Sequence, residues 1–307
     1  MRVIFMGNPE FSLPTLKALI KSNHELVGVV SNTPKPMGRG RQLKHSPVGL
    51  FSRENNLLLI EADSLKSEKL FNQLTELRPD IFVVVAYRIL PKSLIELPKY
   101  GALNLHASLL PKYRGAGPIQ WALMNGDEKT GVTVFQIVSK MDRGDILLQM
   151  EMGIEPNDTM LILGMRLCNA GADLVVDALN GLENSTISAR PQNNEFATSA
   201  PKISKEMTVI DWTWSAKKIH NWIRGLSPRP GMSTQLNGEN IRIYKTKVME
   251  SSTGIPGEII KIDHAITVAT GEGALSLIEI QAPGKQKMKT VDFLRGFEVQ
   301  KGNYLGS

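Results

Sequence analysis

The stretch Ile81-Phe-Val-Val-Val85 decides the fold class, because similar short apolar runs recur along the first third of the chain, at residues 3–5, 26–30, 57–60 and 103–105. Short runs that are apolar throughout are typical of buried strands. The segments between them carry helical patterns, the clearest at residues 12–20, 47–54, 68–77 and 92–97. Strands that alternate with helices in this way predict an α/β fold with a doubly wound, mostly parallel, Rossmann-like sheet.

The pattern changes after a polar, irregular stretch at residues 181–204. A helix at 215–224 is followed by short apolar runs near residues 232–236, 241–248, 257–262, 265–270 and 274–281. Short strands separated by Gly and Asn turns predict a small OB-like β-barrel, a fold that often binds nucleic acid. We therefore expect a first domain at residues 1–185, a linker at 186–206 and a barrel domain at 207–307. We expect Trp212, Trp214 and Trp222 to be part of the core.

The composition is that of an ordinary globular protein. The chain has 307 residues, of which 42% are hydrophobic and 21% charged, and this length suits two domains. No apolar run approaches the roughly 18 residues that span a membrane, and the N-terminus has no signal-peptide pattern. Cys168 is the single cysteine, which excludes an intramolecular disulfide and a cysteine-based metal cluster. We expect a cytoplasmic protein that binds no metal and no membrane.

The first strand is followed by Gly7-Asn-Pro-Glu-Phe11, which lacks the G-x-G-x-x-G pattern of dinucleotide-binding turns. A dehydrogenase is therefore disfavoured. Positive charge is concentrated in the last third: residues 202–307 carry 15 Lys and Arg against 10 Asp and Glu, whereas residues 1–201 carry 21 against 20. Such an excess suits a polyanionic partner, although an ordinary solvated surface would also account for it.

One run places an amide and an imidazole together: Asn104-Leu-His-Ala-Ser-Leu-Leu-Pro111. Alternate residues of a strand point to the same face, so Asn104 and His106 are expected to lie side by side near the end of a strand. Asp142 follows another apolar strand, at residues 131–138, within Met141-Asp-Arg-Gly-Asp145. Carboxyl ends of strands form the ligand crevice of open α/β sheets. The alternative is that Asn104 and His106 form a structural pair and that Asp142 satisfies turn amides.

The Asn-x-His, Ser-Leu-Leu-Pro and Met-Asp-x-Gly-Asp motifs, taken in this order, resemble those of the folate-dependent formyltransferases. Further matches lie at residues 5–11, 37–41, 46–48, 115–120, 200–206, 210–212 and 292–294. Over its whole length, the chain is most similar to the members that formylate methionyl-initiator tRNA. The resemblance implies transfer of a formyl group from 10-formyltetrahydrofolate to the amino group of the methionyl residue, by a monomeric enzyme with a formyltransferase domain and a tRNA-binding barrel.

The resemblance also implies roles for individual residues. Asn104 and His106 would stabilise the oxyanion of a tetrahedral intermediate, and Asp142 would orient the imidazole and help to relay a proton. The folate would be bound by Tyr87, Arg88, Ile89, Leu90, Ser108, Leu109, Leu110, Pro111 and Asp142. The tRNA would be bound by Arg39, Arg41 and Lys44 in the basic loop at residues 35–44, and by Lys202 and Lys205 in the linker.

Two departures from the family pattern stand out. Arg88-Ile-Leu90 replaces a glycine-containing segment and instead resembles the glycinamide ribonucleotide formyltransferases, and Ser227-Pro-Arg-Pro230 replaces a segment with a tryptophan. Three other functions stay open. The acceptor could be an amino-sugar nucleotide, since those enzymes share the motif at residues 108–115. A folate hydrolase would use a similar Asn–His–Asp set. A non-catalytic RNA-binding protein would not need His106.

Overall fold

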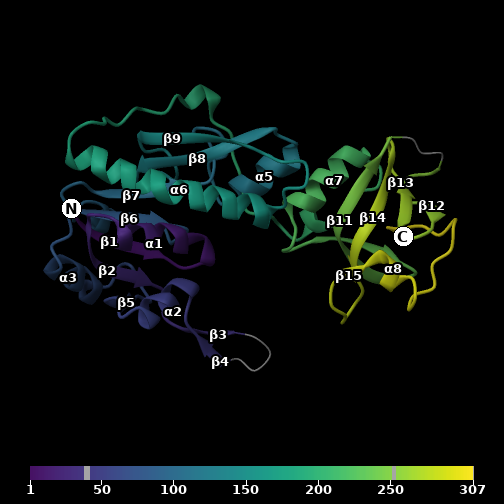
Figure 1. Ribbon diagram of the computed structural model, residues 1–307, viewed down its shortest axis with the longest axis horizontal. Coiled ribbons are helices and arrows are strands. Elements are labelled where there is room, and N and C mark those ends of the chain that lie inside the picture. The colour runs from purple at the N-terminus through teal and green to yellow at the C-terminus, as the bar shows by residue number, and fades with distance from the viewer. Residues whose placement is uncertain (38–41, 251–253, 307) are drawn as a thin grey trace. The chain divides into compact units, whose positions relative to one another are not determined.

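The computed structural model describes residues 1–37, 42–250 and 254–306 (Figure 1). Internal contacts divide the chain into two compact units. Unit 1 comprises Met1–Gly115, Lys129–Gly153 and Gly164–Ser199, and unit 2 comprises Ala116–Glu128, Ile154–Leu163 and Ala200–Ser307. Contact units need not coincide with domains, so the domain limits expected at residues 185 and 206 stay a prediction.

Unit 1 is built on a seven-stranded sheet with the strand order β5-β2-β1-β6-β7-β8-β9. The neighbouring strands from β5 to β7 are paired in parallel, whereas β8 is antiparallel to both β7 and β9. The strands are β1 (Arg2–Gly7), β2 (Glu25–Ser31), β5 (Leu59–Glu61), β6 (Ile81–Val85), β7 (Ala102–His106), β8 (Lys129–Gln136) and β9 (Ile146–Gly153). The predicted mostly parallel sheet is confirmed.

The sheet is doubly wound, since the chain leaves β1 on one side through β2 and β5 and then returns to β6 and β7 on the other side. This reversal creates a switch point between β1 and β6, where open α/β sheets bind their ligands. The Ser12 hydroxyl, just after β1, donates a hydrogen bond of 2.7 Å to the Val85 carbonyl at the end of β6. The two strand ends that border the switch point are thereby tied together.

The helices of unit 1 begin where the sequence supplies N-caps. Ser46 and Ser67 each accept a hydrogen bond from the third residue of the following helix, as N-cap serines do. The helical segments are η1 (Glu10–Ser12), α1 (Leu13–Lys21), α2 (Pro47–Glu54), α3 (Glu68–Glu76), α4 (Lys92–Ile95) and most of α6 (Met160–Glu183). A two-stranded hairpin of β3 (Lys35–Met37) and β4 (Gln42–Lys44) lies where the sequence predicts a basic loop.

Helix α6 lies over the face of β7 that carries Leu105 (Figure 1). A Cβ atom at Gly171 of α6 would lie 2.6 Å from the Leu105 side chain, so a larger residue there would force that side chain to shift. Because side chains alternate along a strand, Asn104 and His106 occupy the opposite face of β7 from Leu105. The helix therefore supports the strand without covering these two residues.

Unit 2 contains a six-stranded antiparallel sheet with the order β10-β11-β14-β13-β12, with β15 paired to β14. The strands are β10 (Met232–Leu236), β11 (Glu239–Met249), β12 (Ile259–Ile262), β13 (Ile266–Ala269), β14 (Ala274–Gln281) and β15 (Met288–Lys289). The helices are α5 (Pro118–Asn125), α7 (Ala216–Gly225) and α8 (Thr290–Phe293), with short turns η2 (Asn194–Phe196), in unit 1, and η3 (Glu206–Thr208).

The C-terminal segment joins the two edges of this sheet. Leu305 bridges Leu236 of β10, and Tyr304 bridges Glu258, next to β12. The Leu305 amide also donates to the Gly257 carbonyl at 2.8 Å. A sheet closed in this way has no free edge there, which agrees with the predicted small β-barrel.

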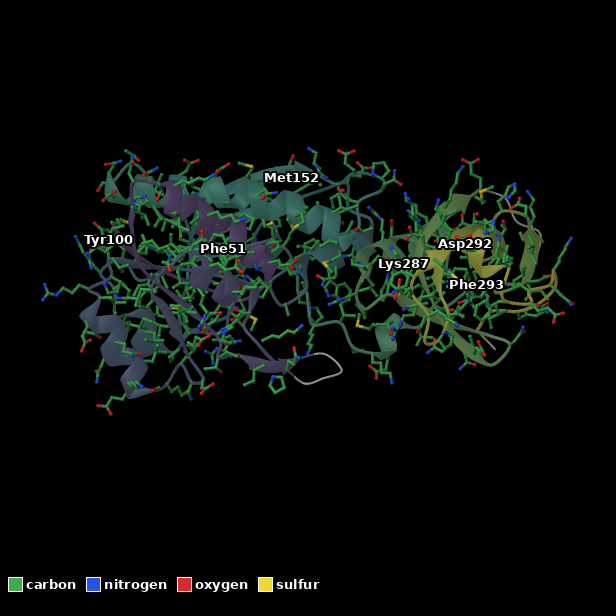
Figure 2. The ribbon with its side chains drawn as sticks, turned by 60° about the horizontal axis from the view of Figure 1, so that its bottom comes forward. Phe51, Tyr100, Met152, Lys287, Asp292 and Phe293 are labelled. Carbon is green, nitrogen blue, oxygen red and sulfur yellow. The ribbon has the colours of Figure 1, made fainter. Side chains whose placement is uncertain are left out.

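The core of unit 2 contains the predicted tryptophans. Trp212 is buried, and Trp214 and Trp222 are partly buried against the same cluster. Phe293 of α8 completes this core and is fully buried (Figure 2). The tryptophans therefore act as packing residues of unit 2, as the sequence predicts.

Candidate active site

His106 ends β7 with its ring fixed by a main-chain group. Its Nε2 lies 2.9 Å from the Tyr113 carbonyl, and only 6% of the residue is exposed. A carbonyl can only accept a hydrogen bond, so Nε2 carries the proton. The other ring nitrogen, Nδ1, lies 3.9 Å from Oδ2 of Asp142. Nδ1 is therefore the ring nitrogen left to face the carboxylate and a reacting group.

Asn104 lies two residues earlier on the same strand. It is paired across the sheet with Phe135 of β8, whose ring meets His106 edge-on at a centroid distance of 6.4 Å. Among the described residues, the Asn104 carboxamide has no hydrogen-bond partner. Asn104 therefore keeps its N–H donors available beside the imidazole.

Asp142 sits in the turn between β8 and β9, in the left-handed region with φ of 52°. Its Oδ2 accepts a hydrogen bond of 2.8 Å from the Gly115 amide, in the loop that follows β7. Gly144, two residues later, has no room for a side chain, because a Cβ there would overlap the Gln136 carbonyl. The structure thus brings Asn104, His106 and Asp142 to one sheet edge, as the sequence predicts.

Residues that the sequence analysis missed complete this site. Tyr113 contributes its carbonyl and Gly115 its amide, and no sequence motif marks either main-chain group. Gln192 donates hydrogen bonds to the carbonyls of Asp142 and Gly144 from a segment read as linker. Its contribution depends on long-range contacts that local sequence patterns do not reveal.

The segment Tyr87–Leu90 follows β6 at the switch point, and its side chains differ in how far they are buried. Leu90 is buried in the core, whereas Ile89 is 72% exposed. The Arg88 guanidinium donates to the carbonyls of Ala62 and Asp63, both at 2.6 Å, and to the Tyr87 hydroxyl. Burial raises the pKa of that hydroxyl. Arg88 thus braces the loop after β5, which gives a structural account of the first departure from the family pattern.

The loop Ser108–Pro111 is held by side-chain groups that bond to main-chain groups of the loop and its end. The Ser108 hydroxyl donates to the Lys112 carbonyl at 2.6 Å, and Thr133 of β8 bonds both the Ser108 carbonyl and the Leu110 amide. Leu110 is buried against Phe135 and Ile146, while Leu109 and Pro111 are partly exposed. The buried side chains shape this edge of the site, and a ligand would meet the main chain and the partly exposed residues.

An open pocket adjoins the Asp142 turn within unit 1. Met141 and Arg143, on either side of Asp142, line it together with Arg114, Gly115, Ala197, Thr198 and Ser199. Burial lowers the pKa of the Arg114 guanidinium, and the nearby charge of Arg143 lowers it further. Its two arginines give this pocket a positive charge next to the Asp142 turn.

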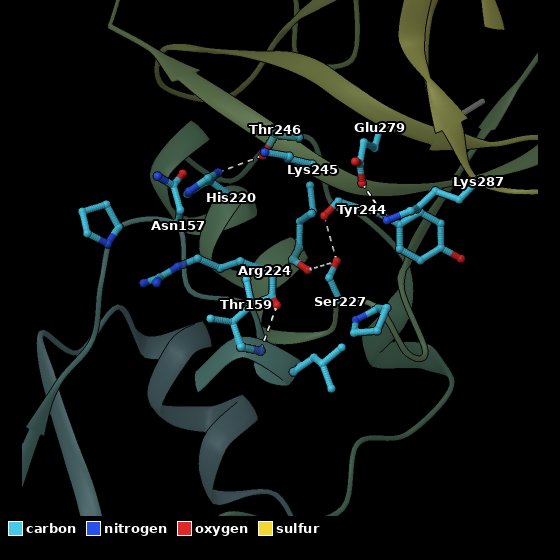
Figure 3. A pocket seen from close by; sticks show the side chains of 15 residues that line it. Asn157, Thr159, His220, Arg224, Ser227, Tyr244, Lys245, Thr246, Glu279 and Lys287 are labelled. Carbon is cyan, nitrogen blue, oxygen red and sulfur yellow. Dashed lines mark hydrogen bonds and ion pairs between the residues drawn. The ribbon is translucent and has the colours of Figure 1, made fainter. Parts of the chain in front are cut away.

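A second pocket lies within unit 2 and contains none of the predicted site residues (Figure 3). Arg224, Lys245 and Lys287 line it, and Lys287 forms an ion pair of 2.8 Å with Glu279. His220 Nδ1 lies 2.9 Å from the Thr246 hydroxyl. Burial lowers the pKa of His220, as does the charge of Arg224. These side chains give the wall of the pocket a net positive charge.

Only some of the residues predicted to bind tRNA lie in the part of the chain that the structure describes. Lys44 is exposed on β4 of unit 1, and Lys202 and Lys205 are exposed in unit 2. Arg39 and Arg41 lie outside the described residues. Within the described ranges, no helix is both long and apolar enough for a membrane span, and no three side chains form a metal-binding group.

Comparisons with known proteins show what family this architecture represents. Residues 1–179 match the family model for formyl transferases, and residues 202–298 match the model for the formyl transferase C-terminal domain. The chain is 43% identical over 309 residues to the methionyl-tRNA formyltransferase of Alkaliphilus oremlandii (strain OhILAs), covering 100% of both chains. It is 38% identical over 309 residues to that of Bacillus subtilis (strain 168), covering 99% of this chain and 98% of the relative.

Solved structures share the fold at lower identity. An N-formyltransferase from Helicobacter canadensis, in complex with folinic acid and dTDP-3-aminofucose, has a TM-score of 0.69 at 21% identity, covering 94% of this chain and 100% of that one. HypX from Aquifex aeolicus, in complex with tetrahydrofolic acid, has a TM-score of 0.68 at 19% identity, covering 99% of this chain and 50% of that one. The family models and the full-length relatives show that the chain belongs to the formyltransferase family and, within it, to the methionyl-tRNA formyltransferases.

Proposed function

We propose that this formyltransferase moves the formyl group of 10-formyltetrahydrofolate to the free amino group of methionyl-initiator tRNA, giving formylmethionyl-tRNA for translation initiation. The observation that most supports this acceptor is the identity of 38–43% to methionyl-tRNA formyltransferases over essentially the whole chain. We further propose that the enzyme acts as a monomer in the cytoplasm.

The reaction passes through a tetrahedral carbon that carries an oxyanion, because the methionyl amine attacks the formyl carbonyl. The free N–H donors of Asn104 are suited to that oxygen. His106, when protonated, donates a second hydrogen bond from Nδ1, since Nε2 is already bonded to Tyr113. Removing one such donor typically lowers the rate by about 10²–10³.

The amine must lose a proton as it attacks, and the folate nitrogen must gain one as it leaves. Asp142 lies 3.9 Å from the imidazole, a distance that exceeds a hydrogen bond and is typical of catalytic groups before substrate binds. We assign Asp142 the role of holding the imidazole and helping to carry this proton. A neutral amine is already a good nucleophile, so the mechanism requires no covalent enzyme intermediate.

The folate donor is proposed to bind at the switch point, against the segments that follow β6 and β7. One edge of this site is apolar because the Ile89 side chain is exposed there. Free polar groups are provided by the main chain of Tyr87, Arg88 and Leu90. The Ser108–Pro111 loop, with Leu109 and Leu110, provides the opposite wall. This arrangement fits a flat pterin ring bound chiefly through main-chain contacts.

The tRNA is proposed to contact exposed lysines on both units: Lys44, Lys202 and Lys205. Arg39 and Arg41 are proposed to take part on the strength of the family resemblance. Each phosphate contact adds to the salt dependence of binding, so replacing Lys202 or Lys205 by Ala should weaken binding and reduce the salt slope by about one.

The test is formyl transfer from 10-formyltetrahydrofolate to three acceptors: methionyl-initiator tRNA, an amino-sugar nucleotide, and water. We expect turnover with the tRNA only, and loss of turnover in His106→Ala. A matched control is His264→Ala, because His264 is exposed in unit 2 and outside every predicted site. Turnover with the amino-sugar nucleotide alone would leave the chemistry intact and make the acceptor wrong. Formate release without an acceptor would indicate a hydrolase, and full activity of His106→Ala would contradict the proposed site.

A further inference from the structure

Gln192 is a buried glutamine whose whole carboxamide is engaged around the Asp142 turn. Only 9% of the residue is exposed. Its Nε2 donates to the Asp142 carbonyl at 3.0 Å and to the Gly144 carbonyl at 2.7 Å. Its Oε1 accepts from Nε of Arg114 at 3.1 Å and from Nη2 at 2.7 Å. Two donors and two acceptor positions are all that a carboxamide has, so every one is used.

The turn that Gln192 holds includes a residue in an uncommon conformation. Asp142 has φ of 52°, in the left-handed region that few residues other than glycine, Asn and Asp adopt. Gly144 is pressed against the Gln136 carbonyl of β8. A turn of this kind keeps its shape only where surrounding groups determine it. The two hydrogen bonds that Gln192 donates hold the carbonyls of Asp142 and Gly144. They thereby fix the direction in which the Asp142 side chain leaves the main chain.

The Oε1 atom of Gln192 helps to hold the segment whose amide binds the Asp142 carboxylate. Gln192 holds the Arg114 side chain, and the next residue, Gly115, donates its amide to Oδ2 of Asp142 at 2.8 Å. The Arg114 main chain is held in addition, because its amide donates to the Thr198 carbonyl at 2.9 Å. One side chain therefore connects the main chain that bears the carboxylate with the main chain that binds it.

We propose that Gln192 is a positioning residue for formyl transfer, and that it acts through the carboxylate of Asp142. This inference rests on the proposed function, in which Asp142 orients His106 and helps to carry the proton. Catalytic geometry is sensitive to small displacements: a shift of about 1 Å can lower a rate by roughly 10²-fold. Gln192 thus gives the segment before Ala200 a part in the reaction in addition to its connecting role.

The test begins with Gln192→Met, which keeps the length of the side chain and removes all four hydrogen bonds. We expect kcat to fall by about 10- to 100-fold, with the KM values for folate and tRNA within about twofold of native, because the Gln192 carboxamide is buried and fully bonded within the protein. The matched control is Asn194→Ala, which removes only the other acceptor of Arg114, a bond of 2.9 Å. We expect that control to keep kcat within about twofold of native.

A double-mutant cycle separates positioning from a general loss of structure. In an Asp142→Asn background, whose residual rate is measured in single turnovers, adding Gln192→Met should lower the rate by less than about twofold. An equal fold loss in both backgrounds would overturn the inference, and so would a native kcat for Gln192→Met. If Gln192→Met does not fold, Gln192→Glu serves instead, since it keeps the acceptor for Arg114, loses both donors and adds a negative charge that faces the two carbonyls. The native rate with methionyl-initiator tRNA tests the proposed function independently of these variants.

Discussion

Gly144 offers a sharp test of how tightly the Asp142 turn is packed. A Cβ atom at this position would overlap the main-chain carbonyl of Gln136. That carbonyl belongs to β8, and the Gln136 amide is itself bonded to the Asp145 carbonyl at 2.9 Å. A paired strand has little freedom to move, so in Gly144→Ala the turn has to shift instead.

The size of the effect follows from what the shift disrupts. Fitting an extra methyl group into a packed site forces shifts that typically lower stability by about 1–3 kcal/mol. The two hydrogen bonds from Gln192, to Asp142 and Gly144, contribute roughly 1 kcal/mol each. Alanine makes the unfolded chain less free, which returns about 0.4–1 kcal/mol. We therefore expect Gly144→Ala to lower the free energy of unfolding by roughly 2–4 kcal/mol, and to lower kcat because Asp142 moves with the turn.

The assay has to report on unit 1. All four tryptophans of the chain, at positions 121, 212, 214 and 222, lie in unit 2, so their fluorescence follows the other unit. Urea unfolding followed by far-UV circular dichroism covers both units. Gly153→Ala is the control, since no atom lies within 4 Å of a Cβ there, and it should change stability by less than about 1 kcal/mol. Native stability in Gly144→Ala would refute this account of the turn.

Three further predictions concern other parts of the chain. Arg88→Met removes the bonds that brace the loop at Asp63, so steady-state kinetics should show the KM for the folate donor raised roughly fivefold, equivalent to about 1 kcal/mol, with kcat nearly unchanged; an unchanged KM would contradict this role. Burial raises the pKa of Cys168 to about 11, so at pH 8 a thiol reagent should label it only after unfolding, and rapid labelling of the native protein would show that the thiol is accessible. Because burial lowers the pKa of His220, the unfolded state binds the proton more readily, and stability should fall as the pH drops below about 6.5. Tryptophan fluorescence should show that His220→Gln reduces this loss; an equal loss in both proteins would exclude His220 as its source.

The helices and strands whose limits were predicted correctly are those with a clear pattern of apolar residues. Helix α2 and strands β6, β10 and β14 begin and end as predicted, because apolar runs and N-cap serines mark their limits. Helix α5 was missed although it begins with Pro118 and ends before Gly126 in the left-handed region. These are recognised start and stop signals for a helix, and the segment between them is only eight residues long.

The site was predicted in part because its strand residues obey local rules. The alternation along β7 was sufficient to place Asn104 beside His106. The atom that each group presents depends on long-range contacts, such as that between the His106 ring and the Tyr113 carbonyl, which no local pattern contains. The segment 186–206 was predicted to be a linker because it is polar and irregular. In the structure, Ile146 and Arg190 form a bridge, and Gln192 donates hydrogen bonds to the Asp142 turn.

The closure of the barrel by Tyr304 and Leu305 has a consequence for biosynthesis. One edge of β12, and the part of the outer edge of β10 that Val209 does not bridge, stay unpaired until residues 302–306 have left the ribosome. Exposed strand edges can recruit strands of neighbouring nascent chains, and long-range pairings form slowly. The interval between the synthesis of β10 and that of the closing segment is therefore a period of vulnerability to aggregation, in which a chaperone would be of most use. Fragments that stop before residue 303 would carry the same vulnerability permanently.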